Sequence, residues 1–415
     1  MRYLKFVLVI LFILVLVQCT SCKTHNNEGV YYYQTLQDAL SDINEECIGR
    51  RDKNITRGAG ALVTLEKGKV TVCLLKDTVE RNTLSLNNIN LDLNGFTLTN
   101  NRTTLFRTYG TCHIYNGYLR RSCNNNKGLN GVIVGRNSTC TMKNVEFTSD
   151  SSYQTNIALI VYGKMYLSHS KISVSTFEST ESVSTIAVYG IMSSHLVIEE
   201  SDITAKSDFG SVQGVYIDGT GELMNSNIAA YSNYQSNEKD FTSSSVGCYS
   251  GGTLTVKNCN IYGVHSGINS VGILSVDFGT YSGYGHGGIY CAGTGKKHKI
   301  TNATILQAEM PLGYHDLGVG CMQGGLYIGG RNGRNNIEVF IDNCIINATK
   351  NPIVLRGTSG EINNSLYISN TIINIQHIRV DNDTHCIYLG VGCNFDKLHV
   401  DIPDVVIYTD DSYGD

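Results

Sequence analysis

The chain has 415 residues, of which 43 are glycine, 3 are proline and none is tryptophan. Charged residues make up 16% of the sequence, below the roughly 25% of an average globular protein. The formal net charge is −4, so no basic field argues for nucleic acid and no nucleic-acid partner is expected.

The first residues are typical of an export signal. Arg2 and Lys5 precede an unbroken apolar run from Phe6 to Val17. This run is shorter than the roughly 20 residues that a membrane-spanning helix needs. The sequence therefore predicts an exported protein rather than one that crosses the membrane.

The apolar run ends in Gln-Cys-Thr-Ser-Cys, which resembles a bacterial lipoprotein signal. Cys19 or Cys22 would then become the lipidated first residue, and a lipid anchor would be the chain's sole membrane contact. The alternative is ordinary secretion with cleavage near Thr20 or Ser21. The expected location is the cell envelope or cell surface, and otherwise the exterior.

The segment after the signal is expected to form a tether and a cap. His25 to Tyr33 is polar and predicts a tether. In the stretch from Gln34 to Asn44, apolar residues recur at helical spacing after Thr35, a possible N-cap. The predicted division is a signal at 1–22, tether and cap at 23–69, a repeat domain at 70–407 and an acidic tail at 408–415.

A ten-residue segment recurs from Ile89 to the end of the chain. Its fifth and tenth positions are apolar in every copy, and its seventh position is asparagine in seven copies. The copies begin at Ile89, Gly110, Ser138, Gly163, Ser194, Gly219, Gly252, Lys296, Ile337, Asn364 and Leu398, and a degenerate copy begins at Gly272. Such a recurrence predicts a repeat architecture.

The phase of the repeat predicts a corner in each copy. In a continuous strand, the third and fifth side chains would face away from the eighth and tenth. A bend at the seventh position returns both pairs to one interior, and asparagine tolerates the left-handed backbone that such a bend needs. Asn94-Gly95 is therefore expected to be a corner of a coil rather than a hairpin turn, with Leu91, Leu93, Phe96 and Leu98 facing inward.

A second strand precedes most copies, for example Gly-Val-Tyr-Ile at Gly214 and Gly-Ile-Tyr-Cys at Gly288. Two or three short strands per coil, stacked along an axis, form a β-solenoid. Several cysteines fall at inward positions and are expected to be small buried apolar residues. A β-sandwich or a propeller fits less well, because the spacing between copies varies.

These motifs resemble the pectate-lyase-like right-handed parallel β-helix superfamily. The opening blocks Thr-Leu-Gln-Asp-Ala-Leu and Leu-Asp-Leu-Asn-Gly-Phe-Thr-Leu-Thr are similar to those of bacterial surface β-helix proteins. The resemblance implies an all-β parallel β-helix of about eleven to twelve rungs with a short N-terminal α-helical cap. It is weak for function, since the superfamily includes lyases, hydrolases, adhesins and tailspikes.

An outward ladder of tyrosines is the first candidate site. Tyr216, Tyr290, Tyr327 and Tyr388 alternate with apolar neighbours and should point out on one face. Aromatic faces can stack on sugar rings. The alternative is that the rings stack on one another or are covered by loops.

The second candidate lies between Tyr281 and Arg334. Its weak catalytic candidates are His286, His315 and Asp316, and Arg331 and Arg334 are added to the expected ligand-binding set. Gly-His-Gly at 285–287 resembles a polygalacturonase signature, but the adjacent aspartate pair of that family is missing. The alternative is a glycine-rich turn.

A calcium-dependent lyase site is the third possibility. Calcium takes six to eight oxygen ligands, and Asp218, Asp277, Asp316 and Asp342 do not fall at matching repeat positions. No cofactor or metal is therefore expected, apart from calcium if the protein is a lyase. The leading hypothesis is a surface protein that binds a polysaccharide or surface glycan, or another surface, without catalysis. The alternative is a lyase or glycoside hydrolase acting on an acidic polysaccharide.

Overall fold

The computed structural model describes residues 29–45, 48, 59–101, 104–123, 129–152, 155–177, 184–208, 210–232, 245–293, 295–308, 324–329, 337–348, 351–356, 364–375, 387–389, 395–401 and 407–409. For residues 123, 129, 356, 364 and 375, and for 387–389, 395–401 and 407–409, the description covers the backbone alone.

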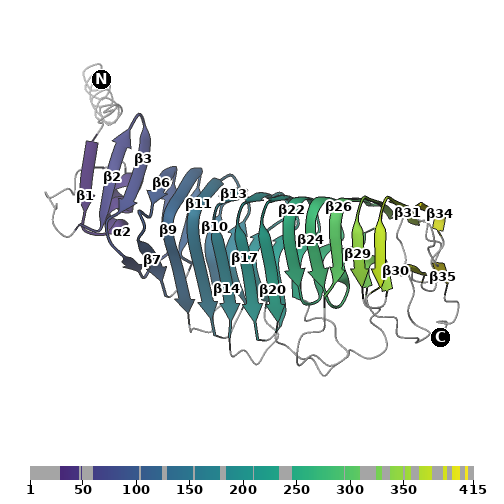
Figure 1. Ribbon diagram of the computed structural model, residues 1–415. Helices are drawn as coiled ribbons and strands as arrows, with labels where there is room; N and C mark the ends of the chain where they lie inside the picture. Colours follow the sequence, from purple (N-terminus) through teal and green to yellow (C-terminus); the bar gives the residue numbers. More distant parts are fainter. Residues whose placement is uncertain are drawn as a thin grey trace, which may run out of the picture.

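The N-terminal cap consists of one helix and three strands. Helix α2 (Leu36–Asn44) begins where the backbone N–H of Asp38 donates to Oγ1 of Thr35 at 3.0 Å. Its buried face carries Leu36, Ala39 and Leu40, and it lies at the N-terminal end of the strands (Figure 1). The predicted cap helix is confirmed. Among the described residues, no helix has the length and apolarity needed to cross a membrane.

The tether prediction is wrong at its C-terminal end. Strand β1 (Gly29–Tyr33) pairs antiparallel with β2 (Ala61–Glu66), which in turn pairs antiparallel with β3 (Lys69–Leu74). Tyr33 is buried in the core, so this segment gains apolar burial as well as backbone hydrogen bonds.

The remaining strands form two sheets. The first sheet has 22 strands, namely β1 to β3 with β4 (Thr78–Glu80), β6 (Ile89–Asp92), β7 (Thr97–Asn100), β9 (Thr111–Cys123), β11 (Thr139–Ser151), β13 (Lys164–Ser168), β14 (Lys171–Thr176), β16 (His195–Glu199), β17 (Asp202–Ser207), β19 (Thr220–Met224), β20 (Asn227–Ser232), β22 (Thr253–Gly263), β24 (Ile273–Gly283), β26 (Lys297–Gln307), β28 (Glu338–Asp342), β29 (Ile345–Ala348), β31 (Asn364–Ser369), β32 (Ile372–Ile375) and β34 (Phe395–Asp401). The second has 13 strands, namely β5 (Leu84–Asn87), β8 (Phe106–Tyr109), β10 (Leu129–Val134), β12 (Asn156–Val161), β15 (Ser184–Gly190), β18 (Ser211–Ile217), β21 (Ser245–Ser250), β23 (Ser266–Ser270), β25 (Gly287–Cys291), β27 (Gly324–Gly329), β30 (Asn351–Arg356), β33 (Ile387–Leu389) and β35 (Ile407–Thr409).

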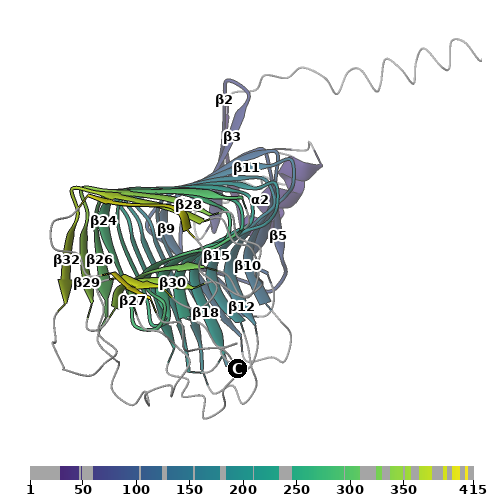
Figure 2. The same cartoon turned by 90° about the vertical axis from the view of Figure 1, so that its right-hand side faces the viewer.

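Each coil visits the two sheets in a fixed order. The chain runs along β16, turns a corner into β17, crosses to β18 and returns as β19, which pairs in parallel with β16. β17 and β18 pair in parallel with β20 and β21 of the next coil. In Figure 2 the 22-stranded sheet bends around two sides of the coil and the 13-stranded sheet forms the third. The fold is the expected right-handed parallel β-helix.

The corners have the predicted backbone. All seven asparagines at the seventh position have positive φ, between 47° and 60°. They are Asn116, Asn144, Asn225, Asn258, Asn302, Asn343 and Asn370. The same φ region is kept where the residue is His169, Glu200 or Phe278. The bend therefore forms at the seventh position whichever residue is there, and asparagine adopts its left-handed backbone with less strain than these other residues do.

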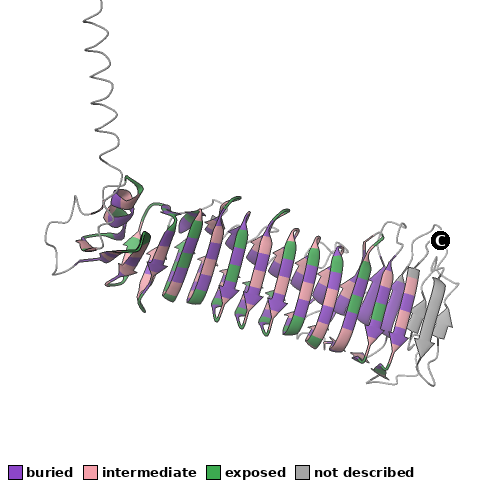
Figure 3. Ribbon diagram, turned by 90° about the horizontal axis from the view of Figure 1, so that it is seen from above, coloured by how far each residue is buried: buried purple, intermediate pink, exposed green. Residues whose placement is uncertain are grey.

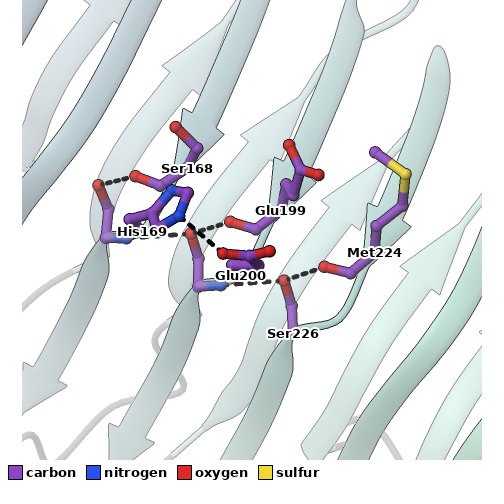
Figure 4. A network of polar contacts seen from close by, with 8 residues as sticks. Ser168, His169, Glu199, Glu200, Met224 and Ser226 are labelled. Carbon is purple, nitrogen blue, oxygen red and sulfur yellow. Dashed lines mark hydrogen bonds and ion pairs between the residues drawn. The ribbon is translucent and has the colours of Figure 1, made fainter.

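Side chains at the corner bond from coil to coil. Nδ2 of Asn144 donates to Oδ1 of Asn116 at 3.3 Å, and Nδ2 of Asn258 donates to Oδ1 of Asn225 at 3.0 Å. Between these two pairs the amides give way to His169 and Glu200, whose Nε2 and Oε2 lie 2.7 Å apart (Figure 4). Polar contact along the corner thus continues where the amides stop.

The first and last copies are shifted by two residues from the predicted alignment. Leu91, rather than Leu93, lies beside Ile114 in the sheet, because the first corner holds two extra residues. The corner itself is confirmed, since β6 and β7 each pair in parallel with β9 and not with each other. At the other end, Val400 rather than Ile402 lies beside Ile368, where the register of β31 and β34 shifts.

The core is a stack of the predicted apolar positions, and buried and exposed residues alternate along the strands (Figure 3). Leu91, Leu93 and Leu98 are fully buried, and Phe96 packs against them. The cysteines whose side chains are described are unpaired, and all of them except the half-buried Cys73 are buried. His298 is an exception among these apolar positions, since it is fully buried where the preceding coil has Leu274.

Replacing Asn258 by alanine should destabilise the protein more than replacing Asn260. Each amide donates one bond to the preceding coil at 3.0 Å, but only Asn258 of the two has a left-handed φ. We expect Asn258→Ala to cost about 1–2 kcal/mol more than Asn260→Ala in urea unfolding, and Asn258→Gly to recover most of that difference. Equal losses for the two alanine variants would contradict a strained corner.

The buried histidine should make stability depend on pH. Burial lowers the pKa of His298 from its ordinary 6.5 to about 4. Between these values the unfolded chain binds a proton that the folded chain does not, so stability falls as the pH falls from about 6.5 to 4. The unfolding free energy of the wild type minus that of His298→Leu should drop by about 3 kcal/mol across this window. A constant difference in chemical denaturation at several pH values would refute the assignment.

Candidate functional site: the aromatic strip of the 13-stranded sheet

Outward side chains of the 13-stranded sheet form a column of aromatic rings. Successive coils place Tyr189, Tyr216 and Tyr249 beside one another, and after Asn269 the column continues with Tyr290 and Tyr327. We call these five tyrosines the aromatic strip. Their neighbours Val215 and Ile217 are fully buried, so the predicted outward direction of the ring of Tyr216 is confirmed. At about 4.8 Å per strand, the strip is about 24 Å long.

The first three rings of the strip pack on each other and are half-buried. The centroids of Tyr189 and Tyr216 lie 4.8 Å apart, edge to face, and those of Tyr216 and Tyr249 lie 4.6 Å apart, stacked. Such pairs stabilise each other by about 0.5–1.5 kcal/mol beyond their buried area. The geometry is therefore that of the alternative interpretation, in which the rings stack on one another.

The charge of one carboxylate, that of Asp218, acts on all three phenols. Asp218 accepts a hydrogen bond from the hydroxyl of Tyr216. Burial, followed by the charge of Asp218, raises the pKa of Tyr216, and the same two causes raise the pKa of Tyr189 and Tyr249. The phenols therefore stay protonated and act as hydrogen-bond donors at neutral pH.

The backbone fixes the position of this carboxylate. Asp218 directly follows β18, and its N–H donates to the carbonyl of Gly190 at 2.8 Å. One coil on, Gly251 leaves room for it, because a Cβ there would lie 2.6 Å from Oδ1 of Asp218. From the sequence, Asp218 was considered only as a possible calcium ligand. Its position directly after Gly-Val-Tyr-Ile could have indicated that it lies near the ring of Tyr216.

The second half of the strip contains a histidine pair. Nε2 of His265 and Nδ1 of His286 lie 2.9 Å apart. The ring of His286 lies 5.0 Å from that of Tyr290 and 4.7 Å from that of Tyr327. The structure thus brings three predicted residues together and adds His265, which sequence analysis missed because no motif surrounds it.

Close packing explains why the first residue of the Gly-His-Gly sequence, Gly285, has no side chain. A Cβ at Gly285 would lie 2.7 Å from Nδ1 of His265. The N–H of His286 donates to the carbonyl of His265 at 2.8 Å. The motif therefore lets two histidines of adjacent coils approach closely, and the pair can hold and pass a proton. Tyr327 is only 3% exposed, so its ring packs against the histidine pair rather than facing solvent.

A hollow of about 280 Å³ extends the same face toward the N-terminus. It is lined by Arg107, Tyr109, Ile133 and Tyr162, among others. Arg107 and Ile133 lie beside one another in the sheet. The face therefore offers a cation at one end, a carboxylate and phenols in the middle, and the histidine pair farther along.

Other expected residues are not placed. Cys19, Cys22, His315, Asp316, Arg331 and Arg334 lie outside the described residues. Tyr388 is described by its backbone alone, which lies beside Val354 in the same column of the sheet. The binding roles of these residues remain predictions.

Two of the aspartates considered for calcium, Asp277 and Asp342, contribute to corners, and contrary to expectation both lie at the sixth position of their copies. Asp316 lies outside the described residues. Oδ1 of Asp277 accepts from Nδ2 of Asn302 at 2.7 Å, and Oδ1 of Asp342 accepts from Nδ2 of Asn370 at 2.9 Å. In the described part of the chain, no three His, Cys, Asp or Glu side chains gather as metal ligands. Calcium binding by a lyase remains a prediction.

Comparisons with known proteins give weak likenesses. No family model matches the chain, and no curated protein matches it. Tailspike protein 3 of bacteriophage CBA120 is similar over 83% of this chain and 53% of its own, with 9% identity and a TM-score of 0.31. The chain thus spans about half the length of that tailspike. The A-module of the Azotobacter vinelandii mannuronan C-5 epimerase AlgE4 is similar over 85% of this chain and 97% of its own, with 12% identity and a TM-score of 0.36.

Proposed function

We propose that the protein is an exported β-helix protein that binds glycan chains along the aromatic strip without catalysis. The observation that carries this proposal is the group of half-buried rings of Tyr189, Tyr216 and Tyr249 around the carboxylate of Asp218. A glycan unit presents apolar C–H faces and hydroxyl groups, and this group offers a partner for each.

The binding chemistry divides between rings and carboxylate. The exposed parts of the rings of Tyr189, Tyr216 and Tyr249 can cover a sugar face, and their hydroxyls can exchange hydrogen bonds with sugar hydroxyls. Asp218 can accept from sugar hydroxyls, and hydrogen bonds to an ionised acceptor are about twice as strong as neutral ones. Because these groups stand on parallel strands, they are held in place before the ligand arrives.

The same geometry favours binding over hydrolysis. Glycoside hydrolysis requires two carboxyl groups that flank the scissile bond. Asp218 is the carboxylate whose charge acts on the phenols of Tyr189, Tyr216 and Tyr249 in the described part of the chain. A single carboxylate that is hydrogen-bonded to a tyrosine is an anchor for hydroxyls rather than an acid–base pair.

Export and anchoring are part of the proposal and rest on the N-terminal sequence. The short apolar run and the two cysteines that follow it support a lipoprotein of the cell envelope, with Cys19 or Cys22 lipidated. Labelling of cells with a radioactive fatty acid tests the anchor, and an unlabelled protein in the culture medium would instead show secretion.

Substitutions in the strip should weaken glycan binding. We expect Tyr249→Leu and Asp218→Asn each to reduce the affinity about tenfold, since a ring contact or a charge-assisted hydrogen bond contributes about 1–2 kcal/mol. A glycan array with the purified protein identifies the ligand, and calorimetry then measures its affinity for each variant.

The matched control is Tyr118→Leu. Tyr118 is 49% exposed and lies on β9 of the other sheet, so its replacement should leave the affinity unchanged. Silence on the array, or equal losses in the strip and control variants, would refute binding along the strip.

A second candidate function is a lyase or glycoside hydrolase acting on an acidic polysaccharide. The 2.9 Å contact between His265 and His286 favours it, because such a pair can transfer a proton. The assay is release of reducing ends or unsaturated uronides, with and without calcium. The leading proposal predicts no turnover. Turnover by the wild-type protein that falls about 100-fold in His286→Gln would contradict the leading proposal and support the enzyme function.

A further inference from the structure

A separate hollow lies on the 22-stranded sheet, on a different face from the aromatic strip. Its volume is about 430 Å³, within the roughly 300–1,000 Å³ of small-molecule sites. Strands β6, β9 and β11 line it, with Asn90, His113, Tyr115, Thr141, Lys143 and Asn144 among the lining residues. The proposed glycan binding along the strip uses none of these residues.

The repeat positions these side chains in two rows. Asn90, His113 and Thr141 lie beside one another on three adjacent coils, and Tyr115 and Lys143 lie beside one another in the next outward row. Adjacent strands are about 4.8 Å apart, and alternate residues on one strand are about 6.7 Å apart. These side chains therefore stand over an area of the sheet of about 10 by 7 Å, which is comparable to one sugar unit.

The corner holds the amides at the rim of the hollow. Nδ2 of Asn144 donates to Oδ1 of Asn116 at 3.3 Å, and Nδ2 of Asn116 lies 3.5 Å from Oδ1 of Asp92. An amide nitrogen carries two hydrogens, so each keeps a second donor beyond this ladder. The left-handed backbone at Asn116 and Asn144 fixes where those donors lie.

Donors dominate the lining. Lys143 supplies a positive charge, and Tyr115 supplies a phenol that bonds to Thr71 and whose pKa is raised by burial and then by Asp92. Thr141 adds a hydroxyl. The carboxylate of Asp92 is not among the lining residues and lies at the edge of the hollow, 3.5 Å from Nδ2 of Asn116. Such a site favours a ligand that is rich in acceptors and carries negative charge.

We propose that this hollow binds a single anionic sugar unit, whose carboxylate, sulfate or phosphate group pairs with Lys143. The asparagine amides and the hydroxyl of Thr141 bind the sugar's oxygens, and the hollow admits one ring. The protein then has two glycan sites on different faces, one for a chain along the strip and one for a charged unit.

The test compares four sugars on the purified full-length protein. Glucuronate, glucose 6-sulfate, glucose 6-phosphate and glucose are titrated, and binding is followed by ligand-detected NMR. At least one charged sugar should bind about tenfold more tightly than glucose, and the preferred one identifies the anionic group. Equal affinities for charged and neutral sugars, or no binding of any of them, would overturn the proposal.

Two variants and a control locate the site. Lys143→Gln should reduce binding of the preferred sugar about tenfold, and Thr141→Val should weaken it severalfold without removing the preference for charge. Lys257→Gln is the matched control, because Lys257 is exposed at the same repeat position on β22. Equal losses with Lys143→Gln and Lys257→Gln would refute the site.

Two further measurements distinguish sugar binding in this hollow from the binding of a free ion and from binding at the aromatic strip. Inorganic sulfate should compete about tenfold more weakly than the preferred sugar, and competition at equal concentration would reduce the site to one for a free ion. Tyr249→Leu should leave the charged sugar's affinity unchanged, so failure of the aromatic strip and failure of this hollow give different results.

Discussion

The left-handed backbone at the seventh position of the repeats, wherever the structure describes that position, is the constraint on which the rest of the structure depends. It turns the chain by a corner, so that the apolar residues before and after it, such as Leu223 and Ile228, both reach the core. Because each coil turns at the same position, its strands pair in parallel with those of the next coil. Amide bonds such as Asn258 to Asn225 then support the corner from coil to coil.

That regularity also determines where function can lie. Because side chains fill the core, a binding site can lie only on the outer faces. The coils stack in register, so one outward position per coil becomes a column of side chains. Tyr189, Tyr216 and Tyr249 become a strip in this way, while His113 and Lys143 come together on the other sheet. Mutual ring stacking of about 0.5–1.5 kcal/mol orders the strip without covering it fully, which is what a binding surface requires.

Much of this was predictable from the sequence, since the phase of the repeat alone requires a bend, and Asn116 and its equivalents have the backbone that the bend needs. The outward direction of Tyr216 followed from alternation. The two shifted copies were not predictable, because an extra residue pair in a corner or a change of register leaves the apolar pattern intact. His265 was missed because its partner His286 lies on the next coil. The place of Asp218 was missed because two of the three phenols that its charge affects, those of Tyr189 and Tyr249, lie on adjacent coils.

The most direct test of the account is a crystal structure with the glycan that binds best on the array. The account predicts the sugar chain along the 13-stranded sheet, with rings over Tyr216 and Tyr249 and a hydroxyl bonded to Asp218. A chain bound elsewhere, with these side chains untouched, would contradict the central claim that the stacked tyrosines and their carboxylate form the binding surface.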